Sequence, residues 1–295
     1  MRTAHREWRW FLTLCLAPSL GVLFVVTLAP MVYLLVTSLT PLNLTNPDTL
    51  FDFSQPFANY ELLPRDERFL NSLWVQAKLS FWTVSLQLVI GVLFALLLNL
   101  RSTLILAVRT VFLIPMVLPP IVVAIIWKVL YTPDISPVHW VLRSMGWDVP
   151  ALITDPNWAL PAIIVADTWE WFPLTMLMVL AALQTLPEEL LDAARVDGAS
   201  RVQTTIYVVL PYIRGTLMVA GLFRLIDSIK AFPLIYLLTD GGPGSVTEVT
   251  NYYAFQQAFN FSYLGFSSAV TMVLVVAVLL LSWWIVRITG WGAES

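Results

Sequence analysis

Residues 79–100 read LSFWTVSLQLVIGVLFALLLNL, which is twenty-two positions without a charged side chain between Lys78 and Arg101. A helix rises about 1.5 Å per residue, so about 20 apolar residues cross a bilayer core about 30 Å thick. A stretch of this length and composition predicts a transmembrane helix.

Uncharged or nearly uncharged stretches of similar length recur along the chain. They predict helices at about 10–37, 71–99, 107–130, 158–187, 213–238 and 264–287. The fifth of these carries Arg224, Asp227 and Lys230, and Pro233 is expected to kink or end it. The predicted fold class is therefore an all-α, polytopic membrane protein with six transmembrane helices.

The composition supports a membrane protein and excludes several other classes. Of the 295 residues, 58% are hydrophobic and 12% are charged, against about 45–50% and about 25% in a soluble domain. Those figures also exclude a disordered chain, and a net charge of -3 without a basic run argues against nucleic-acid binding. The single cysteine, Cys15, allows no intramolecular disulfide.

The arginines are distributed unequally between the two sets of loops. One set holds Arg2, Arg6, Arg9, Arg101, Arg109, Arg195, Arg201, Arg214 and Arg287, and the other holds Arg65, Arg68 and Arg143. Positively charged loops stay in the cytoplasm, so the first set and both termini are predicted to be cytoplasmic. The first apolar run is too long for a signal peptide and lacks a cleavage site, which favours an uncleaved anchor.

One predicted cytoplasmic loop, residues 184–212, reads QTLPEELLDAARVDGASRVQTTIYVVLPY. Pro187 suits the first position of a helix, and Glu188 and Glu189 place negative charge at its positive end. Gly198 is the residue type that ends a helix in a left-handed conformation. Ser200 and Gln203 form a capping box for a second helix, which Pro211 closes.

The first of these two helices has a thin face. At spacings i, i+3, i+4 and i+7 it presents Leu190, Ala193, Ala194 and Asp197. Such a face suits close docking in a groove of another protein. The alternative, a helix lying on the inner leaflet, is opposed by its acidic residues, which anionic lipids repel: Glu188, Glu189, Asp192 and Asp197.

The spacing of this loop resembles a known motif. The run Asp192-Ala193-Ala194, then Gly198, Val208 and Leu210-Pro211, is similar to the EAA loop of permease subunits of binding-protein-dependent ABC importers, with Asp for the usual Glu and Val for the usual Ile. The strings LPEELLDAARVDGAS, WFPLTMLMVLAALQ, LTDGGPGSVTEV and YYAFQQAF resemble the carbohydrate-uptake class, of the maltose and glycerol-phosphate kind. The resemblance extends from about Asn71 to Arg287.

The resemblance implies a type I ABC importer transmembrane fold. Residues 1–70 would form an N-terminal tail, first helix and external loop, 71–287 the permease domain, and 288–295 a cytoplasmic tail. The chain would form half of the translocation pathway for a sugar, polyol or glycoside in a bacterial or archaeal inner membrane. Its implied partners are a second homologous permease, two ATPase subunits and an external solute-binding protein. The residues implied to couple the chain to the ATPase are Glu188, Glu189, Asp192, Ala193, Ala194, Asp197, Gly198, Leu210 and Pro211.

Catalytic chemistry is not expected on this chain. A phosphate-binding loop ends in Gly-Lys-Ser/Thr, but the only lysines are Lys78, Lys128 and Lys230, and none follows a glycine. ATP and Mg would therefore be bound by the partner ATPase, with no cofactor or metal here. For an intramembrane enzyme, an aspartyl dyad of Asp167 and Asp227 is the arrangement left open. A proton-coupled carrier using Asp227 is the alternative transporter, and a channel is a third choice without a visible filter.

Two groups are candidates for lining a transport pathway. The aromatic group is Trp169, Trp171 and Phe172, because sugars stack on aromatic rings. The charged group is Arg224, Asp227 and Lys230, which lie on one helix at i, i+3 and i+6. Charges inside a membrane face a bundle interior or a watery path, so the charged group either ties helices together or contacts the substrate. The turn from Asp240 to Gly244 is predicted to be a rigid external turn rather than a ligand loop.

Overall fold

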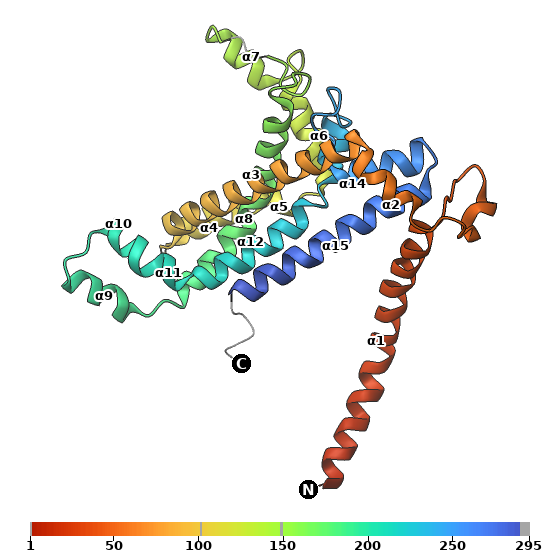
Figure 1. The fold of residues 1–295 in the computed structure, drawn as a ribbon. Coiled ribbons are helices and arrows are strands. Elements are labelled where there is room, and N and C mark those ends of the chain that lie inside the picture. Colours follow the sequence, from red (N-terminus) through yellow and green to blue (C-terminus); the bar gives the residue numbers. More distant parts are fainter. Residues whose placement is uncertain (1, 101, 148–149, 290–295) are drawn as a thin grey trace. The chain divides into compact units, whose positions relative to one another are not determined.

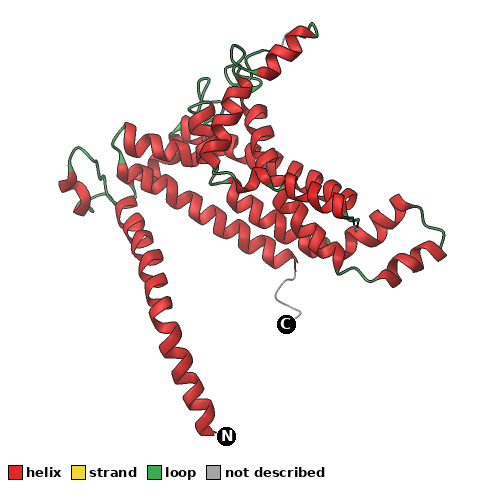
Figure 2. Ribbon diagram, turned by 180° about the vertical axis from the view of Figure 1, so that it is seen from behind, coloured by secondary structure: helices red, strands yellow, loops and turns green. Residues whose placement is uncertain are grey.

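The computed structural model describes residues 2–100, 102–147 and 150–289, with side chains for 15–287 apart from those gaps. In this described part the chain is helical and contains no named strand (Figure 2). The all-α prediction is therefore confirmed. Arg101 lies outside the described residues, as do the side chains of Arg2, Arg6 and Arg9 and most of the predicted tail 288–295.

The chain divides into two compact units, Met1–Asp66 with Ala254–Val276, and Glu67–Tyr253 with Ala277–Ser295. The first unit contains α1 (Arg2–Ser38), η1 (Pro47–Phe51), α2 (Ala58–Leu62), η2 (Leu63–Arg65), η4 (Gln256–Asn260) and the beginning of α15 (Leu264–Thr289). The end of α1 is fixed to α15, because Thr37 donates a hydrogen bond of 2.8 Å to Ser268 Oγ. The backbone N–H of Gly265 donates a hydrogen bond of 2.8 Å to Leu42 O, so the chain after α1 lies close to the beginning of α15.

The second unit is built around α3 (Glu67–Leu98), α8 (Ala159–Gln184) and α12 (Arg214–Ser228), which pack on one another (Figure 1). Its other elements are α4 (Thr103–Phe112), α5 (Ile114–Val117), α6 (Pro120–Tyr131), α7 (Pro137–Ser144), α9 (Glu188–Val196), α10 (Arg201–Thr204), η3 (Thr205–Val209), α11 (Leu210–Tyr212) and α13 (Phe232–Leu238). The helix α14 (Thr250–Phe255) spans the boundary between the units.

A stripe of small and polar residues on α3 forms its contact surface within the second unit. The stripe repeats at helical spacing and is buried along its length: Ser72, Gln76, Ser80, Thr83, Gln87, Gly91 and Ala95. Small residues let membrane helices approach closely, and polar ones hydrogen-bond across the interface. Ser228 Oγ on α12 donates 2.8 Å to Ser80 Oγ. The α3 helix is thus joined to its neighbours by polar contacts as well as by apolar packing.

The helices α3 and α8 approach each other closely at Gly91, and Gly91→Ala is expected to destabilise the protein. A Cβ at this position would lie 2.6 Å from Thr175 Cβ, whereas a Cβ at Gly221 would lie 3.5 Å from Leu88 Cδ1. Overpacking of this kind costs about 1–3 kcal/mol. Gly221→Ala is the matched control, since both changes give a similar gain in helix propensity. Thermal unfolding midpoints in detergent should fall for Gly91→Ala only; equal midpoints for the two variants would contradict the packing described.

The predicted spans are found with one difference, at residues 107–130. By length and composition, four described helices can cross a membrane alone, ending at Ser38, Leu98, Gln184 and Arg287, and a bent pair from Arg201 to Ser228 would make a fifth. The expected helix at 107–130 is instead divided into α4, α5 and α6. The prolines Pro115, Pro119 and Pro120 explain these breaks, because each lacks an amide donor. The expected break near Pro233 is confirmed, since α12 ends at Ser228 and α13 begins at Phe232.

Candidate coupling loop and buried charge cluster

The loop between α8 and α12 begins with the short helix α9. Pro187 is its N-cap rather than its first helical residue, and Glu188 and Glu189 occupy the first turn as predicted. Gly198 has φ +76°, and its N–H donates 3.0 Å to Arg195 O, so the predicted left-handed end of the helix is confirmed. The first predicted helix of the loop is therefore formed, one residue shorter at its beginning.

The second helix of the loop starts as predicted and then departs from regular geometry. The capping box is present, because Gln203 N–H donates 3.3 Å to Ser200 Oγ and Ser200 N–H donates 2.8 Å to Gln203 Oε1. After α10 the chain forms the π-helical turn η3 and then α11. Pro211 accounts for the wider turn, since its ring crowds the carbonyl of Tyr207, four residues earlier. The axis then bends by 67° between the segments Arg201–Tyr212 and Arg214–Ser228.

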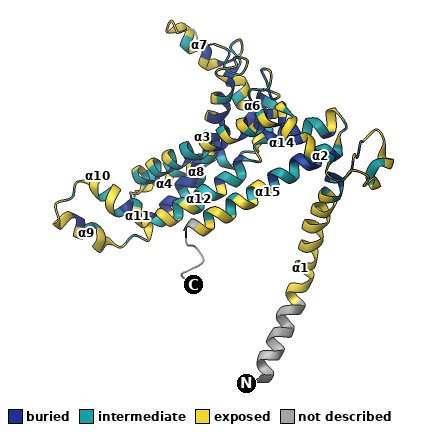
Figure 3. Ribbon diagram, in the orientation of Figure 1, coloured by how far each residue is buried: buried dark blue, intermediate teal, exposed yellow. Residues whose placement is uncertain are grey.

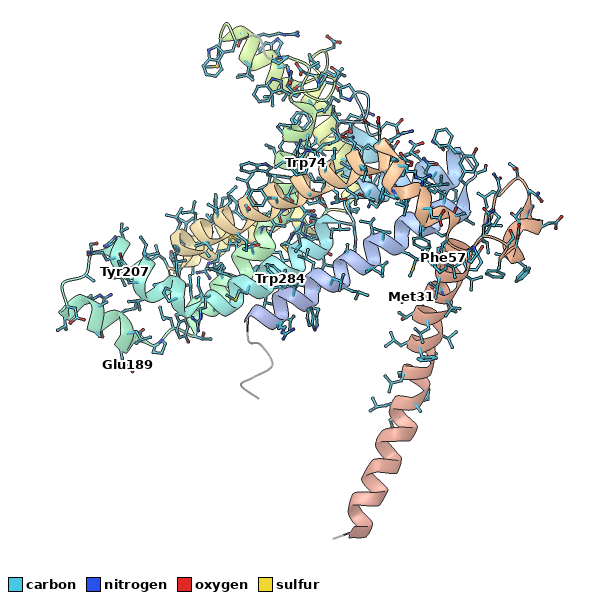
Figure 4. All side chains as sticks on the ribbon, viewed as in Figure 1. Met31, Phe57, Trp74, Glu189, Tyr207 and Trp284 are labelled. Carbon is cyan, nitrogen blue, oxygen red and sulfur yellow. The ribbon has the colours of Figure 1, made fainter. Side chains whose placement is uncertain are left out.

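Most of α9 is exposed on the outside of the unit (Figure 3). Of its described side chains only Ala194 is buried, and Glu189 projects from the helix (Figure 4). The ion pair between Asp192 and Arg195, at 2.7 Å, lies on this exposed surface as well. The exposed candidates for coupling are Glu188, Glu189, Asp192, Ala193, Asp197 and Gly198. Glu188, Glu189, Asp192 and Ala193 of α9 are therefore accessible to a partner, whereas Ala194 of the predicted docking face is covered by the chain itself.

The base of the loop is anchored in an apolar core. That core consists of Ala95, Met176, Val179, Leu180, Leu183, Val209 and Ile213. Leu186, Leu191 and Leu210 pack against it from the loop. Pro211 next to this core is exposed. The predicted residue Leu210 thus anchors the loop to the bundle instead of joining the exposed surface.

The charges on α12 belong to a cluster centred on Arg224, whose side chain is only 1% exposed. Its Nε donates 2.8 Å to Gln87 Oε1 on α3, and its two terminal nitrogens lie 3.2 Å from Asp227 Oδ2 and 3.8 Å from Asp167 Oδ2. The guanidinium also lies 4.6 Å from the centre of the Trp171 ring. Arg224 therefore links α3, α8 and α12 through ionic, hydrogen-bonding and cation–π contacts.

Asp227 and Lys230 lie at the exposed edge of this cluster. Lys230 Nζ is 3.7 Å from Asp227 Oδ1. The side chain of Lys230 is 72% exposed and that of Asp227 is 41% exposed. The predicted i, i+3 neighbours are thus found, but Lys230 lies in the turn beyond the end of α12 rather than on the same helix, and the three residues differ in environment. Arg224 is buried, Asp227 is half-exposed, and Lys230 is exposed at the surface.

Two members of the cluster, Gln87 and Glu170, were not among the predicted site residues, and Asp167 was considered only for an aspartyl dyad. Gln87 donates a hydrogen bond of 2.8 Å to Asp167 Oδ2 and also accepts the hydrogen bond from Arg224. Glu170, one turn from Asp167, is buried, and neither of its carboxylate oxygens has a hydrogen-bond partner among the described residues. The available signal was weak: one glutamine in an uncharged stretch, and two acidic residues at i, i+3 in a predicted span.

Trp169 and Phe172 lie beside an apolar groove of about 620 Å³ between α3, α4, α5 and α8. The ring of Phe172 is 5.3 Å from that of Phe94 and 6.2 Å from that of Phe112, and Trp169 packs edge-on against Trp127 at 5.8 Å. Such aromatic contacts stabilise helix packing. The assignment of Trp169 and Phe172 to a transport pathway stays a prediction.

The glycine-rich turn after α13 is held by a dense set of hydrogen bonds. Tyr252 Oη donates 2.5 Å to Asp240 Oδ1, and Thr247 Oγ1 donates 2.7 Å to Gly242 O. Arg68 forms two hydrogen bonds of 2.7 Å with the carboxylate of Glu248. These contacts agree with the predicted rigid turn.

The fold agrees with comparisons against known proteins. Residues 87–289 match the family model described as "Binding-protein-dependent transport system inner membrane component". The chain belongs to this family. Members of this family are non-catalytic permease subunits located in the inner membrane, and ATP hydrolysis takes place on a separate chain.

Relatives of this permease include the "Trehalose/maltose transport system permease protein MalF" of Thermococcus litoralis, 34% identical over 79% of this chain and 79% of the relative. The "Sulfoquinovosyl glycerol transport system permease protein SmoG" of Agrobacterium fabrum is 32% identical over 90% and 86% of the two chains. A chain of the crystal structure of "a bacterial ABC transporter involved in the import of the acidic polysaccharide alginate" superposes with a TM-score of 0.84 at 22% identity, covering 100% of both chains. This superposition confirms the importer fold.

Proposed function

We propose that this permease forms half of the translocation pathway of an ATP-driven importer of a sugar, polyol or glycoside. The observation that carries the proposal is the exposed α9 surface, with its EAA-like sequence, on a chain of the binding-protein-dependent family. The carbohydrate class is supported by relatives whose names refer to trehalose, maltose and sulfoquinovosyl glycerol.

In the proposed assembly the chain pairs with a second homologous permease and receives solute from an external binding protein. Two ATPase subunits bind ATP and Mg, and one of them accepts α9 in a groove. Both termini lie in the cytoplasm, as the arginine distribution predicts. A structure related in fold was crystallised with an "alginate pentasaccharide-bound periplasmic protein", which supports a binding-protein partner.

The energy of ATP binding would be transmitted through the base of the loop. Leu186, Leu191 and Leu210 pack on the same core as Ile213, which directly precedes α12. A displacement of α9 therefore acts on α12 and its charge cluster. Asp227, Lys230 and Trp171 are the members of that cluster with exposed or half-exposed side chains, and they are the strongest candidates to contact a hydroxylated solute.

Ala193→Arg is expected to abolish co-purification of the ATPase subunits while the permease still inserts and folds. Ala193 is exposed on α9, so a long side chain there blocks close docking without disturbing the interior of the bundle. Gly198→Val should have a similar effect, because φ +76° at Gly198 strains a β-branched residue. Pull-down of the ATPase from detergent-solubilised membranes measures the result.

Two matched variants serve as controls. Ser144→Arg adds the same side chain to the exposed end of α7, and Gly198→Asn keeps a residue that tolerates the left-handed conformation. Both should retain the ATPase. Normal ATPase recovery with Ala193→Arg and Gly198→Val would overturn the docking role of α9.

A further inference from the structure

Tyr212 joins the two ends of the loop that carries α9. Its phenolic hydroxyl donates a hydrogen bond of 2.8 Å to the backbone carbonyl of Thr185, twenty-seven positions earlier in the chain. Thr185 is the C-cap of α8, where the last carbonyls of a helix lack intrahelical donors. The hydroxyl of Tyr212 therefore satisfies an otherwise open backbone acceptor and closes the loop on itself.

This contact is specific to one of the two tyrosines in the segment. Tyr207, in the π-helical turn η3, is 75% exposed and projects from the loop (Figure 4), and no contact of its hydroxyl is found among the described residues. Tyr212 is 42% exposed, at the end of α11. The two side chains differ in contacts although they lie only five positions apart.

The position of Tyr212 gives the contact a mechanical consequence. The next residue, Ile213, is buried in the core formed with α3 and α8, and the 67° bend lies at the same point. Beyond the bend, α12 leads to Arg224. The hydrogen bond to Thr185 thus connects the end of the loop, next to α12, to the end of α8, where the loop begins.

We propose that Tyr212 is a positioning residue for energy coupling. Its hydrogen bond to Thr185 holds the coupling loop to α8, so that a displacement of α9 moves α8 and α12 together instead of distorting the loop. The inference rests on the proposed ATPase-driven function. The loss of one neutral hydrogen bond, about 1 kcal/mol, corresponds to about a fivefold decrease in the ratio of fastened to released loop.

The test compares Tyr212→Phe with Tyr207→Phe and Thr185→Val in the complete complex in lipid nanodiscs. Tyr207→Phe removes a hydroxyl without a described contact. Thr185→Val keeps the backbone carbonyl that accepts the 2.8 Å bond and loses only the longer contact, 3.5 Å, between Tyr212 Oη and Thr185 Oγ1. With Cys15 replaced, spin labels at Ala181 and Val202, both exposed, report the distance from α8 to α10. The complex is trapped in its ATP-driven state by adding ATP together with vanadate.

We expect all three variants to retain the ATPase subunits in normal amounts. Tyr207→Phe and Thr185→Val should show one narrow distance distribution that shifts on vanadate trapping. Tyr212→Phe should show a second, broader population, enriched about fivefold relative to the controls, and a reduced shift. A distribution and shift identical to those of Tyr207→Phe would overturn the positioning role, whereas absence of the ATPase from the wild-type complex would overturn the proposed function instead.

Discussion

Arg224→Met is expected to reduce the stability of the bundle by about 3–5 kcal/mol, the cost of breaking a buried ion pair by removing one partner. Arg224 is only 1% exposed, and its removal leaves the buried carboxylate of Asp167 without its cation. Glu170, also buried, loses the same neighbouring positive charge. Methionine retains much of the volume of the arginine, so the change isolates the electrostatic loss from a cavity effect. Thermal unfolding in nanodiscs provides the measurement.

Two variants of the same cluster act as controls for this result. Lys230→Met removes an exposed cation from the turn that follows α12 and should leave the unfolding midpoint nearly unchanged. Asp227→Asn removes a half-exposed partner while Asp167 and Gln87 still contact Arg224, so its stability should lie between the other two. If Arg224→Met were as stable as Lys230→Met, the cluster would not tie the helices together.

Arg68→Met is expected to lower stability by about 3 kcal/mol and to open the glycine-rich turn after α13. The carboxylate of Glu248 is 1% exposed and receives two hydrogen bonds of 2.7 Å from Arg68. Without Arg68 it becomes a buried charge without its cation, and the effect is at the lower end of the range because Arg68 itself is 44% exposed.

Limited proteolysis at the turn, together with the unfolding midpoint, measures this effect. Arg65→Met, at an exposed position three residues earlier, is the control and should be cut as slowly as the wild type. The double variant Arg68→Met with Glu248→Gln should recover part of the stability, since the remaining amide carries no charge. Equal cleavage rates for Arg68→Met and Arg65→Met would show that the ion pair does not hold the turn.

Local signals in the sequence predicted much of the fold and of the coupling loop. Apolar runs of sufficient length identified the long helices, as at 79–100 within α3. Residues with a particular backbone or capping role identified the loop: Gly198 at a left-handed helix end, and Ser200 with Gln203 as a capping box. These features depend on neighbours within a few positions, which is why the sequence alone contains them.

Features that depend on distant contacts could not be predicted in the same way. The partnership of Gln87 with Arg224 joins residues 137 positions apart, and the bond from Tyr212 to Thr185 depends on the 3D path of the loop. The division of the predicted span 107–130 follows from Pro115, Pro119 and Pro120, which interrupt helical hydrogen bonding without lowering the hydropathy of the run. Sequence spacing correctly paired Arg224, Asp227 and Lys230, but their burial depends on helices elsewhere in the chain.

Measuring which energy source drives transport is the most direct test of the proposed ATP-driven function. The complete complex would be reconstituted in vesicles with the binding protein carrying its co-purified solute, and uptake of that solute measured with either ATP or a pH gradient as the sole energy source. We predict uptake with ATP alone, loss of that uptake in Ala193→Arg, and no uptake driven by the gradient. Gradient-driven uptake that continues without ATP would contradict the account and favour a proton-coupled carrier.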